Sequence, residues 1–169
     1  MRVYYAEYNS PIGPITLITT DKGLCFVQFG NVSDVLPVAE KWRSKHSLRG
    51  TLIEDCVALS DVIQQLDEYF SGKREKMEVT FELFGTPFQR RVWHALEHIP
   101  YGETRSYKEI AAAAGSQKAV RAVGSANNKN PLSIFIPCHR VIGSNGKLVG
   151  YGGGLDKKIA LLRLEGAWG

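Results

Sequence analysis

The chain has 169 residues, of which 44% are hydrophobic and 22% charged, and its formal net charge at pH 7 is +4. This composition excludes disordered and fibrous proteins, and the lack of a long apolar run or a signal peptide makes us expect a soluble, intracellular protein with no membrane partner. Residues 1–84 hold 9 basic and 12 acidic side chains, whereas residues 85–169 hold 12 and 5. A polyanion would therefore bind the second half, unless the excess only forms a solvated basic face.

The first half is predicted to hold strands and one helix. Alternating apolar residues between turn residues predict an antiparallel meander, and a later helical periodicity predicts a helix followed by a short strand. The expected elements are strands at Val3–Tyr8, Ile15–Thr20 and Leu24–Phe29, a helix from Leu59 to Phe70, and a strand at Met77–Phe81. Because Leu83–Gly85 is the best loop for a boundary, we expect domains at residues 1–84 and 85–169.

The second half is predicted to be mainly helical. Thr86 before a proline, and Ser106 with a glutamate three residues later, are typical of helix N-termini. A third helix is expected from about Gln117 to Asn127, after a turn at Gly115. The last two helices predict a helix-turn-helix.

The third predicted helix is rich in small side chains. They allow a backbone to approach either a neighbouring helix or a ligand closely. Lys118, Arg121 and Lys129 lie in the same segment, which favours contact with phosphates over simple packing in a core.

The cysteines and histidines do not predict a metal site. Cys25, Cys56 and Cys138 are widely spaced without a C-x-x-C motif, so we expect reduced thiols. His94 and His98 are four residues apart, but we see no acidic or thiol partner nearby in sequence to complete a site.

One segment combines a thiol with an imidazole. The apolar run Leu132–Ile136 is expected to be a buried strand that leads into Cys138 and His139. Such a pair is also common as core packing, but a glycine-rich loop follows it and suits close approach to a ligand. A last helix, from Asp156 as its cap to Glu165, places a carboxylate that could orient the histidine.

The segment Ile136-Pro137-Cys138-His139-Arg140-Val141-Ile142-Gly143 closely resembles the active-site signature of the O6-alkylguanine-DNA alkyltransferases. The resemblance extends over Gly85–Gln89, Ile99–Glu103, Ala119–Gly124 and Glu165-Gly166, and so covers essentially residues 85–166. It implies an α/β protein with a ribonuclease-H-like N-terminal domain and a helical, winged-helix-like C-terminal domain. It also implies irreversible transfer of an alkyl group from O6-alkylguanine in DNA, with O4-alkylthymine as a second candidate substrate.

The resemblance assigns roles to four catalytic residues. It makes Cys138 the nucleophile and alkyl acceptor, His139 its base through a bridging water, and Glu165 the group that holds the imidazole. Tyr107 would donate a proton or hydrogen bond to the departing base. A free thiol is only a few per cent ionised near neutral pH, so the nucleophile needs such a base.

The resemblance also assigns contacts to the substrate and to DNA. The Val141 carbonyl would recognise the exocyclic amine of guanine and Tyr151 would pack beside the base, while Gly152 replaces the serine of many members and offers only its backbone. Because the target oxygen is out of reach inside a duplex, the nucleotide must be extruded. The remaining expected DNA contacts are the arginine finger Arg121, the small residues Ala119, Ala122, Gly124 and Ser125, and Asn130, which ties the helix to the active-site segment.

The expected enzyme is a methylated-DNA–protein-cysteine S-methyltransferase that acts once, without cofactor or metal. We expect a monomer on double-stranded DNA, cytoplasmic and nucleoid-associated, or nuclear in a eukaryote. Three alternatives remain: an alkyltransferase-like sensor, which lacks the reactive cysteine, a helix-turn-helix transcription factor, and a Cys-His hydrolase with turnover. Covalent alkylation of the protein separates the first two from the enzyme.

Overall fold

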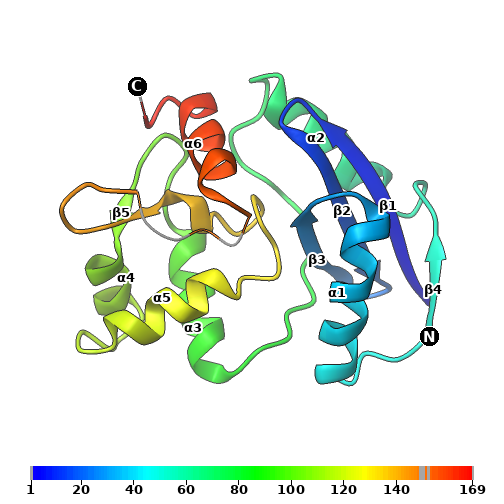
Figure 1. Cartoon of the computed structure of the whole chain (residues 1–169), viewed down its shortest axis with the longest axis horizontal. Coiled ribbons are helices and arrows are strands. Elements are labelled where there is room, and N and C mark those ends of the chain that lie inside the picture. Colours follow the sequence, from blue (N-terminus) through cyan, green and yellow to red (C-terminus); the bar gives the residue numbers. More distant parts are fainter. Residues whose placement is uncertain (1, 149–150, 152, 169) are drawn as a thin grey trace. The chain divides into compact units, whose positions relative to one another are not determined.

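The N-terminal sheet begins with the predicted antiparallel meander. Its strands are β1 (Arg2–Ser10), β2 (Gly13–Thr20) and β3 (Gly23–Phe29), and β4 (Thr51–Glu54) adds to β1 in parallel, for the order β3-β2-β1-β4. The structure is a computed structural model that describes residues 2–148, 151 and 153–168. By its internal contacts the chain divides into two compact units, one up to Phe84 and one from Gly85 (Figure 1).

A helix that the sequence analysis does not predict packs on this sheet. α1 (Val32–Lys45) begins at the N-cap Asn31, whose side chain accepts a hydrogen bond from the Asp34 backbone N–H at 2.9 Å. It contains Pro37, a residue that usually disfavours a helix interior. Its buried residues Val35 and Ala39 belong to the same apolar cluster as residues of the sheet. The helix is therefore maintained by tertiary packing.

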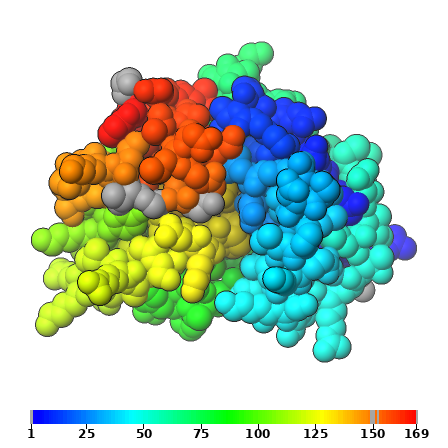
Figure 2. All heavy atoms as spheres, viewed as in Figure 1, coloured from blue at the N-terminus to red at the C-terminus, as the bar shows by residue number. Residues whose placement is uncertain are grey.

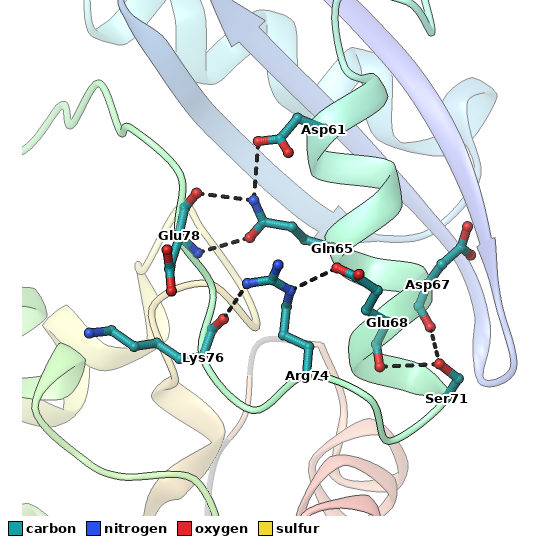
Figure 3. A network of polar contacts seen from close by, with 8 residues as sticks. All are labelled: Asp61, Gln65, Asp67, Glu68, Ser71, Arg74, Lys76 and Glu78. Carbon is teal, nitrogen blue, oxygen red and sulfur yellow. Dashed lines mark hydrogen bonds and ion pairs between the residues drawn. The ribbon is translucent and has the colours of Figure 1, made fainter.

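α2 (Ser60–Phe70) forms as predicted and secures the segment that follows it. The Gln65 amide accepts from the Glu78 N–H at 2.8 Å and donates to the Glu78 carbonyl at 3.0 Å, and it also donates to Asp61 (Figure 3). Arg74 bonds to Glu68 in the same network, at 2.9 Å. The strand predicted at Met77–Phe81 is wrong: within this segment only Phe81 makes a bridge, to Leu24, and the backbone of Glu78 bonds to the side chain of Gln65 instead of to a strand.

The second unit is built on three helices. They are α3 (Pro87–Glu97), α4 (Tyr107–Ala113) and α5 (Val120–Asn128), and each contacts the other two. Both predicted N-termini are confirmed as capping boxes, Thr86 with Gln89 and Ser106 with Glu109. The buried Trp93 indole N–H donates to the Ala126 carbonyl at 2.9 Å and so joins α3 to α5.

Three predicted boundaries in this unit are wrong. α5 begins at Val120 and not near Gln117, because residues 117–118 form a separate turn and Ala119 is the N-cap. Leu132–Ile136 is a buried turn, not a strand, since the Ile136 N–H bonds back to the Leu132 carbonyl at 2.9 Å. Asp156 is not the cap of α6 (Leu155–Leu164): Gly154 is, at φ +101°, a conformation that favours glycine.

The reactive segment lies between short elements. The 3-10 helix η1 (Cys138–Arg140) is followed at once by β6 (Val141–Ile142), which pairs in parallel with β5 (Arg105–Ser106). β5 in turn runs directly into α4. Within the described part of the chain, no helix has the length and apolar character needed to cross a membrane.

Candidate active site

Cys138 is the first residue of η1 and is 4% exposed. Its N–H donates to the Ile136 carbonyl at 2.7 Å, and the Arg140 N–H donates to the Pro137 carbonyl at 3.0 Å. The preceding turn contains Ile134 at φ +75°, which is rare for a β-branched residue. The thiol is therefore held on a tight, buried and locally strained turn.

Two asparagines tie this turn to the end of α5. Asn130 Nδ2 donates to the Ile136 carbonyl at 2.8 Å, while its Oδ1 accepts from the Leu132 N–H at 3.0 Å. Asn127 Nδ2 lies 3.4 Å from the Cys138 carbonyl. The link expected for Asn130 is thus present as two hydrogen bonds, and Asn127 adds one that the sequence analysis does not predict.

His139, Glu165 and Arg140 form a buried polar cluster. His139 Nε2 lies 2.8 Å from Glu165 Oε2, and neither side chain is exposed. Arg140 donates to both oxygens of the same carboxylate, at 2.8 and 2.9 Å, and to the Ile99 carbonyl at 2.7 Å. These bonds of Arg140 were not expected from the sequence, although the residue belongs to the motif.

The charges of this cluster determine which nitrogen of His139 can act as a base. Burial acts to raise the pKa of Glu165, but the hydrogen bonds and charges of His139 and Arg140 lower it to about 2. Burial lowers the pKa of His139. An ionised carboxylate can only accept, so Nε2 of the neutral imidazole carries the proton and Nδ1 keeps a lone pair. That buried Nδ1 has no hydrogen-bond partner among the described residues.

Lys158 is a buried cation beside the thiol. Burial raises the pKa of Cys138, whereas the polar side chains of Asn130 and Tyr151 and the charge of Lys158 act to lower it. Lys158 comes from α6, is fully buried, and its Nζ donates to the Val141 carbonyl at 2.5 Å. Burial lowers the pKa of Lys158 to about 8, while the Cys138 thiolate acts to raise it. Lys158 was not predicted, because lysine is almost never fully buried.

Two tyrosines complete the surroundings of the sulfur. Burial raises the pKa of Tyr107, the Cys138 thiolate raises it further, and a hydrogen bond with Asn127 acts to lower it. Burial raises the pKa of Tyr151 well above its usual value, and the Cys138 thiolate adds to this. Both hydroxyls therefore stay protonated near neutral pH and can act as donors.

The outer face of α5 is open. Arg121, Ala122 and Ser125 are exposed, and the segment is uncovered on the face drawn in Figure 2, where it is yellow. Ala119 and Gly124 are half-buried, and a Cβ at Gly124 would lie 4.0 Å from the Tyr107 ring. The exposed face of α5 therefore carries small side chains and the long basic side chain of Arg121. Gly124 on the same helix lies against the ring of Tyr107.

The structure brings most of the predicted site residues together. Tyr107 and Tyr151 are both within electrostatic reach of the Cys138 sulfur. His139, the next residue in the chain, bonds to Glu165. Gly152 lies outside the described residues. All three cysteines of the chain are free thiols, and within the described residues no three His, Cys, Asp or Glu side chains are grouped so that they could hold a metal ion.

Comparisons with known proteins identify the family. The ribonuclease-like domain of 6-O-methylguanine DNA methyltransferase matches residues 3–83, and the DNA binding domain of that methyltransferase matches residues 87–167. The chain belongs to the 6-O-methylguanine DNA methyltransferase family. The resemblance and the fold class expected from the sequence are thereby confirmed.

Named relatives match over nearly their whole length. The methylated-DNA–protein-cysteine methyltransferase of Methanosarcina acetivorans is 47% identical over 98% of this chain and 99% of its own. The constitutive enzyme of that name in Bacillus subtilis is 43% identical over 96% and 94%. A crystal structure of Mycobacterium tuberculosis OGT in complex with DNA matches with a TM-score of 0.82 and 43% identity, covering 98% of this chain and 93% of that one.

Proposed function

We propose that this protein repairs DNA by transferring the alkyl group of O6-alkylguanine to Cys138. Family membership supports the reaction class, and the relative from Mycobacterium tuberculosis crystallised with DNA supports DNA as the partner. The proposed domains are residues 1–84, ribonuclease-H-like, and residues 85–169, which bind DNA and carry the site. We propose that the protein acts as a monomer on chromosomal DNA, in the cytoplasm with the nucleoid, or in the nucleus if the source is a eukaryote.

The reaction begins with loss of the thiol proton. His139 Nδ1 accepts it through a bridging water, and Glu165 stabilises the imidazolium that forms, because its carboxylate already accepts from Nε2. The charge of Lys158 favours the thiolate. The Cys138 sulfur is then an activated nucleophile.

The transfer itself is a displacement at the alkyl carbon. A bond forms between Cys138 Sγ and that carbon, the bond from carbon to guanine O6 breaks, and its electron pair stays on the base. The Tyr107 hydroxyl donates to the base as this charge develops. The base takes up, in exchange, the one proton that the Cys138 thiol lost. The products are guanine in DNA and a thioether on the protein, and no cofactor is needed. Removing the alkyl group again would take a second nucleophile, so each molecule acts once.

Guanine is recognised by residues around the sulfur. The Val141 carbonyl accepts from the exocyclic amine of the base, and its second lone pair remains available beside the bond from Lys158. Tyr151 packs beside the ring, and Gly152 offers its backbone N–H. These contacts hold the alkyl carbon in line with Cys138.

Access to the base requires its extrusion from the duplex. α5 lies against the minor groove, where Ala119, Ala122, Gly124 and Ser125 leave room for the backbone. Arg121 fills the space of the flipped nucleotide, and Asn130 couples the end of α5 to the turn of Cys138. The basic character of residues 85–169 supports binding to phosphates.

The buried bond between His139 and Glu165, next to Cys138, is the single observation that carries this proposal. The test is the intact mass of the protein after reaction with a duplex that contains one O6-methylguanine, followed by peptide mapping. We expect one methyl group per molecule, on Cys138, and none on a Cys138→Ser variant. Methylation at Cys25 or Cys56, or product beyond one equivalent, would contradict the proposal.

A further inference from the structure

Two histidines near the end of α3 lie outside the site described above. His94 and His98 are both exposed, and their spacing of four residues places them on one face of the helix. Their ring centroids are 4.7 Å apart and the ring planes are inclined by 75°. The alkyl transfer uses neither side chain.

A hydrogen bond determines the tautomer of His98. The His98 N–H donates to the Ala95 carbonyl, at 3.2 Å, in a tightened last turn, and the ring Nδ1 lies 2.9 Å from the His94 carbonyl. A carbonyl only accepts, so Nδ1 of His98 carries the hydrogen and Nε2 keeps its lone pair. Metal-binding histidines use this arrangement, with one nitrogen on a carbonyl and the other on the ion.

The separation of the two rings fits a shared ion. Metal–nitrogen bonds of about 2.0–2.1 Å with bond angles between about 90° and 109° hold two imidazole centroids roughly 4.6 to 5.4 Å apart. The 4.7 Å between His94 and His98 falls within that range. The separation of the two rings is therefore compatible with chelation of one ion.

The charged side chains close to the pair in sequence are Arg90, Arg91 and Glu97. Among the described residues, Glu97 and the two histidines do not form a group of three that could hold a metal ion. The guanidinium of Arg91 lies over the Phe88 ring, 5.6 Å from its centroid, and so is turned back along the helix.

We propose that His94 and His98 chelate a divalent transition-metal ion through one nitrogen of each ring. Imidazole ligands suit Cu²⁺, Ni²⁺ and Zn²⁺. Water completes the coordination, since the described residues contain no group of three side chains that could hold a metal. This surface site is independent of the proposed alkyl transfer.

Binding of an ion has a structural consequence at the end of α3. His98 is the C-cap, and the carbonyl of the next residue, Ile99, accepts from Arg140 at 2.7 Å. An ion that joins His94 to His98 cross-links the last turn before this carbonyl. We expect it to raise the melting temperature of the protein, because it binds only the folded helix.

The test is a calorimetric titration of the full chain with Ni²⁺, which does not oxidise thiols. All variants carry Cys56→Ser, because the exposed Cys56 could bind the ion. We expect one equivalent to bind, and His94→Gln and His98→Gln each to weaken binding by about tenfold or more, as loss of a group at a metal site does. The matched control His46→Gln, a histidine of the N-terminal unit, should bind as the parent does.

Thermal melting gives a second readout on the same variants. Ni²⁺ should raise the melting temperature of the parent and of His46→Gln, and raise that of the two α3 variants less at the same Ni²⁺ concentration. Absence of Ni²⁺ binding to the parent, or binding in both α3 variants as tight as in the parent, would overturn the proposal. Alkyl transfer does not enter either measurement, so the result stands apart from the proposed function.

Discussion

Arg140 donates two parallel hydrogen bonds, at 2.8 and 2.9 Å, to the two oxygens of the buried Glu165 carboxylate. Such forked pairs are among the strongest charge-assisted hydrogen bonds in proteins. They hold the carboxylate ionised and oriented, and this in turn makes His139 Nε2 the donor and leaves a lone pair on Nδ1. In the proposed mechanism, Arg140 therefore positions the base His139 through Glu165.

Replacing Glu165 with glutamine should slow alkyl transfer by about 10²- to 10⁴-fold, the usual contribution of a general base. The neutral amide cannot stabilise the imidazolium, and loss of the charge lowers the pKa of His139 further. The acidic limb of the rate profile against pH should therefore also shift to lower pH. Single-turnover rates with an alkylated duplex measure both effects. Glu103→Gln, which removes a charge from an exposed ion pair, is the control. If Glu165→Gln reacted about as fast as this control, a role of Glu165 in activating Cys138 through His139 would be excluded.

The protein should lose stability as the pH falls from about 6.5 towards 2. The folded-state pKa of His139 lies below 6.5 and that of Glu165 lies at about 2, below 4.5, so both groups contribute stability at higher pH that protonation removes. Urea unfolding between pH 7 and pH 3 measures the free energy of unfolding. Glu165→Gln should show a smaller change than the parent below pH 4.5, whereas Glu103→Gln should follow the parent. If the free energy of unfolding changed equally with pH in all three proteins, the low pKa assigned to Glu165 would be contradicted.

Lys158→Met should slow alkyl transfer at neutral pH, because the buried cation that favours the thiolate is lost. A neighbouring charge moves a pKa by about 1–3 units, so we expect a loss of about tenfold or more and recovery as the pH is raised. Rates with a free O6-alkylguanine base from pH 6 to 10 test this. Lys157→Met, one position along on α6, is the control. If the rate of Lys158→Met followed the same pH dependence as that of Lys157→Met, the charge of Lys158 would not favour the Cys138 thiolate.

Arg121→Ala should impair repair of duplex DNA more than reaction with a free alkylguanine base. The exposed side chain is proposed to act on extrusion and not on bond making. Extrusion costs a few kcal/mol, and 1.4 kcal/mol is about tenfold, so the ratio of the two losses should be about ten or more. Comparable losses on both substrates would assign Arg121 to folding or chemistry instead.

Alkylation of Cys138 should destabilise the protein. The sulfur lies in a turn of buried residues, and overfilling a packed site costs about 1 to 3 kcal/mol, or about 2 to 10 °C in melting temperature at this chain length. A benzyl group should lower the melting temperature more than a methyl group. Thermal melting of free, methylated and benzylated protein tests the order, and unchanged or raised midpoints would show a pocket that already fits the adduct.

Features that depend on a few neighbouring residues were predictable from the sequence. The capping boxes at Thr86 and Ser106 are local hydrogen-bonding patterns, and the meander follows from alternation between turns. The assignment of Cys138 depended on the motif, because a buried Cys-His pair alone is also ordinary packing.

Features that depend on tertiary partners were not predictable. β4 forms only because β1 offers it a parallel edge, and α1 contains a proline that argues against a helix. The apolar run before Cys138 fits a strand or a turn equally well, and the hydrogen bonds from Asn130 select the turn. Lys158 follows the ordinary pattern of a surface lysine in a charged helix, and only the folded chain shows that it is buried.

The short parallel pair of β5 and β6 connects the turn of Cys138 directly to α4, the first helix of the proposed DNA-binding pair. Val141 pairs with Arg105 and Ile142 with Ser106, so the residues just after Cys138–Arg140 are in register with the N-cap of α4. If the proposed function holds, we expect an added alkyl group that displaces η1 to move the first turn of α4 as well, because β6 joins them directly. Alkylation of Cys138 is then expected to weaken binding to the duplex, so that a used molecule leaves the site it has repaired.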